Sequence, residues 1–152
     1  MAKRRLATVP AGVHSTTVSS AKKIWSEKTI RGHTLSFQPN RSGVYFAPFQ
    51  SDEASALRSY LRDSAASIRE KYGLNSDGRG EATILFELLE TDRLLKLPRP
   101  LGTGGEEAIF DGDVDVSSSS RLAFLHLRSQ QKFTQNTGSS LRLPAVVRAL
   151  LP

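Results

Sequence analysis

An amphipathic pattern over residues 51–72 constrains the fold of this chain more than any other feature of its sequence. Asp52 and Glu53 occupy the expected first turn, and Gly73 follows the last apolar position as a stop signal. Between these signals, apolar residues recur at helical spacing: Leu57, Tyr60, Leu61, Ile68 and Tyr72. The pattern predicts one amphipathic helix over residues 51–72.

Strands are expected over much of the remaining chain. β-Branched and aromatic residues dominate residues 29–37 and 43–49, and the turn-forming residues between them predict a hairpin. The apolar run at 82–97 suits a buried strand or a buried helix equally, and we favour two strands, joined by a turn at 90–93 and ending before Pro98.

The last third of the chain adds two expected strands and a short helix. Apolar residues from Ile109 to Val116 alternate with aspartates, and residues 121–128 form another strand pattern. Pro144 precedes a short helical segment at 145–151. The predicted fold class is therefore α+β, with a mostly antiparallel sheet, one main helix at 51–72, a short C-terminal helix and a flexible basic N-terminal arm.

Length and composition favour one hydrophobic core. A chain of 152 residues that is 38% hydrophobic is too short for two comfortable domains. No stretch approaches the roughly 18 to 20 apolar residues that cross a bilayer, so we expect a soluble protein. The chain has no cysteine, which excludes disulfides, thiolate chemistry and cysteine-ligated metal sites.

Residues 1–25 are expected to form the flexible basic arm, ahead of a single α+β domain at 26–152. They mix Lys and Arg with small and polar residues and show neither helical nor strand periodicity. The absence of acids before Glu27 would also fit a mitochondrial transit peptide, although Pro10 and Gly12 interrupt the amphipathic helix that such a signal needs.

Charge is unevenly distributed along the chain. Residues 1–35 hold seven basic side chains against Glu27 alone, which accounts for the whole net charge of +6. Residues 81–115 carry nine acids against three bases, and residues 121–152 carry five bases and no acid. Opposite patches can cancel within one fold or pair between chains. The apolar residues at 141–151 favour self-association into a homo-oligomer, although the same residues could equally close the core of their own chain.

Motifs for catalysis or metal binding are weak. Asp111, Asp113 and Asp115 alternate along a strand and are interpreted as a solvated face rather than a cation site. The glycine-rich residues 102–105 are interpreted as a plain turn, because the acids that follow them would repel a phosphate. We predict no catalytic residue, no metal ligand and no cofactor.

Two histidines offer the only acid/base alternative. His33 and His126 could act together as in a metal-independent ribonuclease, since imidazole titrates near neutrality. Nothing in the sequence places them together. His126 lies between Leu125 and Leu127 and is interpreted as a half-buried histidine of a strand.

Nucleic acid is the partner that the basic residues favour. On one straight helix, Arg58, Arg62 and Arg69 would fall within about 40° of each other, so they could straddle a phosphate backbone or simply cover the edge of the core. Trp25 could stack on a base or anchor the arm. The predicted binding residues are Lys3, Arg4, Arg5, Lys22, Lys23, Lys28, Arg31, Arg58, Arg62 and Arg69.

The sequence thus favours a non-enzymatic, nucleic-acid-associated structural or assembly protein that binds RNA or DNA without sequence preference. Viral coat and nucleoprotein subunits share this layout, which is an analogy of composition and favours an intracellular or virion-associated location. A small protein-binding or regulatory module with an acidic partner is the first alternative. A small nuclease or toxin that uses His33 or His126 is the second.

Overall fold

The computed structural model describes residues 11–33, 42–49, 54–72, 78–89, 92–101, 105–130, 132–136 and 140–141. Within these residues the chain is an α+β fold built on an antiparallel sheet, as predicted. The predicted helix at 145–151, the loop residues 102–104 and residues 1–10 of the predicted arm lie outside the described residues.

Three helices and ten strands make up the described part of the chain. The helices are α1 (Val18–Glu27), α2 (Ala54–Arg62) and α3 (Ala65–Tyr72). The strands are β1 (Ala11–Thr16), β2 (Thr29–Ile30), β3 (Gly43–Phe49), β4 (Ala82–Glu87), β5 (Leu94–Leu101), β6 (Gly105–Asp111), β7 (Val114–Asp115), β8 (Ala123–Leu127), β9 (Lys132–Gln135) and β10 (Ser140–Leu141).

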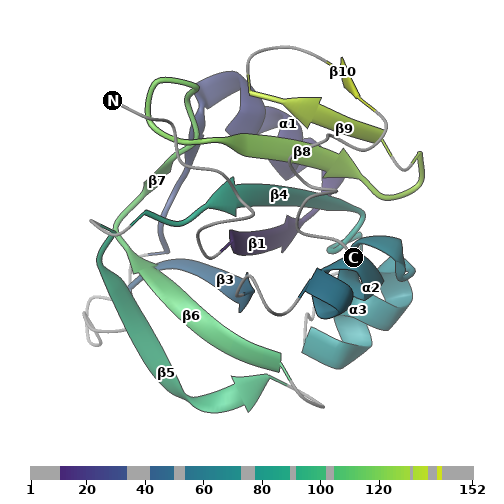
Figure 1. The fold of residues 1–152 in the computed structure, drawn as a ribbon, viewed down its shortest axis with the longest axis horizontal. Coiled ribbons are helices and arrows are strands. Elements are labelled where there is room, and N and C mark those ends of the chain that lie inside the picture. The colour runs from purple at the N-terminus through teal and green to yellow at the C-terminus, as the bar shows by residue number, and fades with distance from the viewer. Residues whose placement is uncertain are drawn as a thin grey trace.

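The main sheet has the strand order β10-β9-β8-β4-β1-β3-β6-β5 (Figure 1). Neighbouring strands within it are antiparallel, and β2 pairs with β7 in a separate small sheet. β1 pairs with β4 over residues 11–16 and with β3 over residues 11–13, so it joins the two halves of the main sheet. The N-terminal strand is therefore central to the fold.

The predicted arm is wrong for residues 11–25, because they form β1 and most of α1. Small residues give β1 no strand pattern in the sequence, and Gly12 is the clearest case. A Cβ at Gly12 would lie 2.6 Å from Cζ of Phe86 and 2.9 Å from Cδ2 of Phe46. Those two rings meet edge to face across β1, with centroids 5.4 Å apart, so the strand contributes a gap that its neighbours fill.

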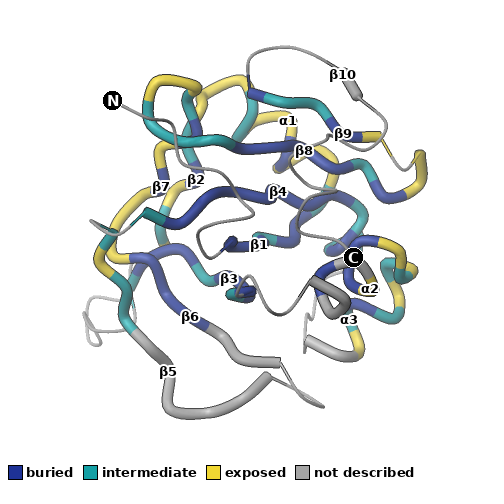
Figure 2. Tube along the Cα trace, viewed as in Figure 1, coloured by how far each residue is buried: buried dark blue, intermediate teal, exposed yellow. Residues whose placement is uncertain are grey.

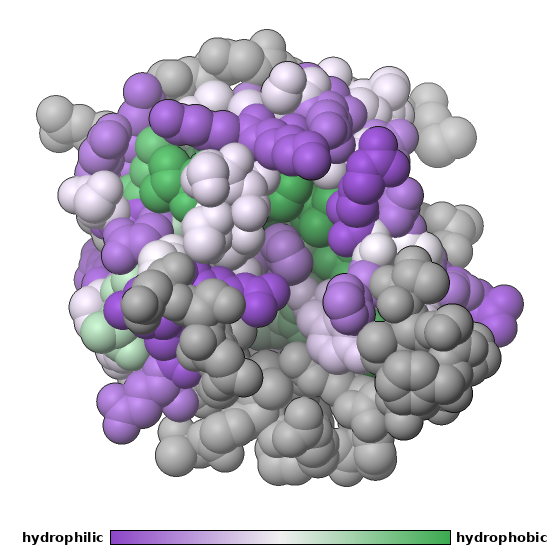
Figure 3. Space-filling model, turned by 180° about the vertical axis from the view of Figure 1, so that it is seen from behind, coloured by the Kyte–Doolittle hydropathy of each residue, from purple (hydrophilic) through white to green (hydrophobic). Residues whose placement is uncertain are grey.

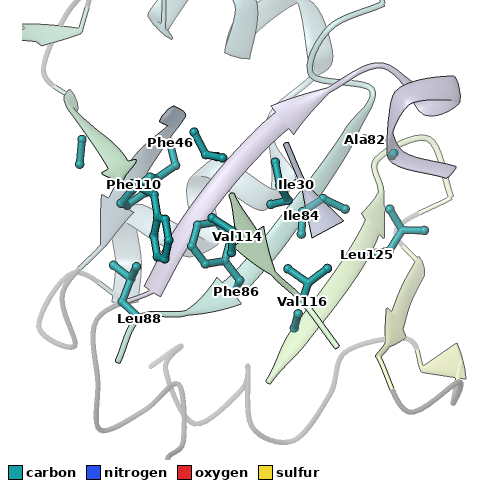
Figure 4. Packing of buried hydrophobic residues seen from close by; sticks show 14 residues of the cluster. Ile30, Phe46, Ala82, Ile84, Phe86, Leu88, Phe110, Val114, Val116 and Leu125 are labelled. Atoms are coloured by element: carbon teal, nitrogen blue, oxygen red, sulfur yellow. The ribbon is translucent and has the colours of Figure 1, made fainter. Parts of the chain in front are cut away.

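Two hydrophobic clusters cover the two faces of the sheet. The α1-side cluster is closed by α1 and by the β2–β7 pair, and Figure 4 shows its side chains pointing toward one another from several strands. Its members are Ala21, Ile30, Val44, Phe46, Ala82, Ile84, Phe86, Leu88, Ala108, Phe110, Val114, Val116, Ala123 and Leu125. Figure 2 shows that the central strands are buried, while the outer side of α1 is exposed.

The α2/α3-side cluster lies on the opposite face. It packs α2 and α3 against alternate residues of the central strands. Its members are Ala11, Val13, Ala47, Phe49, Leu57, Tyr60, Leu61, Ile68, Leu85, Phe124 and Phe133. The apolar positions that predicted the helix at 51–72 thus include core residues, as their spacing indicated.

The predicted single helix at 51–72 is two helices, interrupted at Asp63 and Ser64. Ser64 Oγ accepts a hydrogen bond from Ser67 N (3.2 Å) and so begins α3. Arg128 satisfies the end of α2, because its Nη1 donates to Tyr60 O (2.6 Å) and to Asp63 O (2.8 Å). This arginine is only 6% exposed and follows β8, 65 residues beyond Asp63, so no local pattern predicts the break.

Several strand predictions are confirmed, but pairings differ and the single strand expected at 109–116 is wrong. Gly112 (φ 86°) separates β6 from β7, and the two strands belong to different sheets. β3, β4 and β8 fall within the predicted segments, and β5 continues beyond Pro98 because it is an edge strand, where a missing N–H is tolerated. The hairpin predicted between residues 29–37 and 43–49 is wrong: β2 pairs with β7, and only a single bridge joins His33 to Gly43.

We predict that Gly12→Ala lowers the free energy of unfolding by about 1 to 3 kcal/mol, because the added methyl group overpacks the rings of Phe46 and Phe86. Phe86→Leu should destabilise the protein alone yet reduce the cost of Gly12→Ala when the two are combined. Urea unfolding of the four proteins measures this coupling, which we expect to exceed about 0.5 kcal/mol. Additive effects of the two substitutions would show that contact with the Phe86 ring does not determine the cost of Gly12→Ala.

Candidate nucleic-acid interface

Local caps fix both ends of α1. Thr17 Oγ1 accepts a hydrogen bond from Ser20 N (3.2 Å) at the start. Lys28 ends the helix in the left-handed conformation (φ 60°), and its N–H donates to Ile24 O. These caps satisfy backbone groups that a helix otherwise leaves without partners, so the register of the α1 side chains is defined by the helix's own sequence.

The outer side of α1 carries lysines among small polar residues. Ala21 is fully buried, and Ile24 and Trp25 pack against the α1-side cluster. The exposed residues of the helix are Val18, Ser19, Ser20, Lys22, Lys23, Ser26 and Glu27. Figure 3 shows hydrophilic side chains gathered on the upper part of this face, where α1 lies.

Trp25 lies at the border between the buried and the exposed sides of α1. Its side chain is partly buried, and Lys28 Nζ lies over the indole ring at 5.5 Å from the centroid. Lys22 precedes Trp25 by three residues on α1 and is its neighbour on the helix surface, whereas Lys28 reaches the ring from the left-handed residue after the helix. Exposed cations therefore come before and after the aromatic ring in sequence.

Arg31 is exposed but paired. Its Nε lies 3.4 Å from Glu27 Oε1, and its Nη1 lies 3.8 Å from Asp113 Oδ2. These contacts compensate the negative charge of Glu27, the acid of α1, with a positive charge that follows the helix.

We denote Lys22, Lys23 and Lys28, together with Trp25, the α1 surface.

Sequence reasoning missed one lysine on the same side of the sheet. Lys132 of β9 pairs directly with Leu127 of β8, and residues opposite each other in an antiparallel pair project from the same face. Leu127 packs against the α1-side cluster, and Lys132 is exposed. The pairing of β8 with β9 is what places Lys132 on this face, and the sequence alone does not give that pairing.

The ten predicted binding residues do not form one group. Lys3, Arg4 and Arg5 lie outside the described residues, as does the side chain of Arg58. Arg62 and Arg69 belong to α2 and α3, which pack on the opposite face of the sheet from α1.

The predicted arginine ridge is disrupted by the break between α2 and α3. Arg62 is exposed on α2, whereas Arg69 Nη1 on α3 donates to Arg79 O (3.1 Å). Arg58, Arg62 and Arg69 would share one side only on a continuous helix, and the chain leaves the helix at Asp63 and Ser64.

The three aspartates each have a structural contact. Asp111 pairs with Arg93 (3.3 Å), and Asp113 Oδ1 accepts from Gly32 N (2.7 Å). Asp115 accepts from Ser117 N (2.9 Å) and Ser120 Oγ (2.7 Å), and these bonds lower the pKa of its carboxyl group. Among the described residues, no group of three or more His, Cys, Asp or Glu side chains is arranged to hold a metal ion.

His126 is fully buried rather than half-buried. It is 0% exposed and stacks on Phe133 with centroids 4.4 Å apart. His33 is exposed where it bridges to Gly43. A nuclease mechanism that uses His126 would require a substrate to reach a side chain without solvent contact, so this histidine is a poor candidate.

Part of the charge that segregates along the sequence is cancelled within the fold. Arg121 and Asp92 form a paired ion contact at 2.8 and 3.0 Å, with both side chains 7% exposed. Arg121 Nη1 also donates to Glu87 O (2.9 Å). Two bases of the C-terminal segment, Arg121 and Arg128, are thus unavailable at the surface, and self-association through opposite patches remains a prediction.

His14 occupies the point where the β1–β3 ladder ends. The register pairs stop at Val13 and Ala47, and beyond them His14 Nδ1 donates to Tyr45 O (2.8 Å). Burial lowers the pKa of His14, the carbonyl of Tyr45 opposes this effect, and the charge of Arg79 lowers the pKa further.

No helix among the described residues is both long enough and apolar enough to span a membrane. The chain matches no protein-family model, and comparisons with curated proteins and with solved structures also found no match.

We predict that the free energy of unfolding decreases as the pH is lowered below 6.5, the ordinary pKa of histidine, and that His14 contributes to this decrease. The folded pKa is lower than the unfolded pKa, so the unfolded chain binds more protons as the pH falls. Urea unfolding above and below pH 6.5 should show a smaller loss for His14→Gln, which keeps a donor for Tyr45 O. An identical loss in both proteins would exclude His14 as the titrating group.

Proposed function

We propose that this protein is a non-enzymatic, nucleic-acid-associated protein whose α1 surface contacts the phosphate backbone. One observation carries the proposal: exposed Lys22 and Lys23 stand on one side of a capped helix, while its acid, Glu27, pairs with Arg31. Positive charge on this side is therefore not compensated by the helix itself. The proposed role is structural or in assembly, and the nucleic acid that the protein binds is RNA or DNA.

The chemistry of the α1 surface favours binding without sequence preference. A lysine ammonium is a compact point charge, and its contacts with phosphate release condensed counterions whatever the base sequence. The exposed serines that flank the lysine pair on α1 are small, so they leave the ammonium groups accessible to a polyanion. Base-specific readout would instead need side chains that reach base edges in a groove.

An acidic protein surface would be attracted by the same charges. It differs from nucleic acid because its carboxylates are irregularly spaced and carry no condensed counterion layer of the kind found on a polynucleotide. Competition between a polynucleotide and polyglutamate for the purified chain separates these two partners. Stronger binding of polyglutamate would favour the regulatory-module alternative.

We predict that Lys22→Gln/Lys23→Gln lowers affinity for nucleic acid and reduces the slope of log K against log salt by about 1.4 to 1.8 in total. Each lysine that contacts a phosphate contributes about 0.7 to 0.9 to that slope. Fluorescence anisotropy of a labelled oligonucleotide over a salt series measures both quantities.

The matched control is Arg62→Gln/Arg93→Gln, which also removes two positive charges. Arg62 lies on α2, on the opposite face, and Arg93 is paired with Asp111. We expect its slope to stay close to that of the wild type. An equal fall in the two double variants would mean that net charge, and not the α1 surface, determines binding.

Truncation tests the contribution of the N-terminal residues, but its end point matters. Deletion beyond residue 10 would remove β1, which holds the sheet together. We predict that deletion of residues 2–9, which contain Lys3, Arg4 and Arg5, leaves the melting temperature nearly unchanged and reduces the salt slope further. An unchanged slope would restrict binding to the folded body.

A further inference from the structure

We propose that Trp25 is a stacking platform for an unpaired base, so that the α1 surface prefers single-stranded to double-stranded nucleic acid. This inference rests on the proposed function and specifies its ligand. It depends on the position of the indole between the core and the lysines, rather than on charge alone.

The indole is held from below and accessible from its outer side. Trp25 packs against the α1-side cluster, which fixes the ring, yet its side chain is only partly buried. This contrasts with Phe46 and Phe86, which are 3% and 0% exposed. A stacking platform needs both properties, because a mobile ring loses entropy on binding and an enclosed ring cannot meet a base.

The group that covers the ring is replaceable. Lys28 Nζ lies over Trp25 at 5.5 Å from the centroid, in an exposed cation–π contact. A nucleotide offers both a π face for the indole and a phosphate for the ammonium group. Lys28 can therefore exchange one favourable contact for another while the base occupies the face of the ring.

Lysines flank the ring on both sides in sequence. Lys22 lies three residues before Trp25 within α1, about 4.5 Å along the helix axis, and Lys28 lies three residues after it, at the left-handed residue that ends the helix. Phosphates on the two sides of a stacked base can thus each meet an ammonium group. This pattern, aromatic rings among cations that follow the backbone, is the general means of binding single strands without sequence readout.

A duplex cannot use the ring in the same way. Its bases are paired and stacked on each other, so a base must leave the stack before an external indole can cover its face, at a cost in unpairing. The lysines remain able to contact duplex phosphates. Single strands should therefore gain an increment that duplexes lack, roughly five- to 150-fold for one stacked base.

Trp25 is the only tryptophan of the chain, so fluorescence excited at the red edge, where the three tyrosines do not absorb, reports on this site alone. Oligo(dT) and a duplex of equal length are titrated into the full-length protein at the same salt concentration. We expect oligo(dT) to quench the emission and to protect the ring from acrylamide. The duplex should bind, as judged by anisotropy, with little effect on the emission.

Trp25→Leu keeps apolar cover on the cluster but removes the stacking face. We expect it to weaken oligo(dT) binding about five- to 150-fold and to leave duplex binding unchanged, whereas Trp25→Phe should retain part of the preference. Where Trp25→Leu does not fold, as judged by circular dichroism, protection of the wild-type ring from acrylamide decides the question.

The two proposals fail in different ways. Salt-dependent binding of both ligands, with equal or no quenching and no change in Trp25→Leu, would overturn the stacking platform and leave the α1 surface as a simple phosphate contact. Absence of binding to either ligand in the wild type would overturn the proposed function itself.

Discussion

The contact of Phe46 and Phe86 across Gly12 is the interaction on which the rest of the structure depends. β1 is the strand that connects β4 to β3, and therefore connects the two halves of the main sheet. Because Gly12 has no side chain, rings from both neighbours meet over the strand with centroids 5.4 Å apart. A side chain there would overpack both rings, so packing favours a residue with poor strand propensity at this position.

The same strand determines where the cations lie. α1 begins two residues after β1 ends, with Thr17 as its cap, and its apolar side closes over the sheet next to the β2–β7 pair. The orientation of Lys22 and Lys23 toward solvent follows from the burial of Ala21 and from the packing of Ile24 and Trp25 against the α1-side cluster. A basic segment that reads as a free arm is thus a helix whose charged side is fixed by the core.

The sequence predicts those elements whose signals are local. β3, β4 and β8 are rich in β-branched, aromatic or leucine residues, and their strand pattern is sufficient. β1 has no such pattern, because its residues are chosen for fit between two neighbours. The break between α2 and α3 is equally hidden, since the arginine that stabilises it, Arg128, lies 65 residues beyond Asp63. Such non-local contacts override propensity.

Charge counted along a sequence is not charge at a surface, and this difference decides which basic residues can meet a polyanion. Arg121 is neutralised by Asp92 in an ion pair whose two side chains are each 7% exposed. Arg128 donates hydrogen bonds to the backbone carbonyls of Gly80 and Tyr60. Arginine suits such buried roles because its planar fork satisfies several acceptors at once. The lysines of α1 have no comparable task. Their ammonium groups remain at the surface because burial without partners would be costly, which makes them, rather than the more numerous arginines, the side chains that define this face.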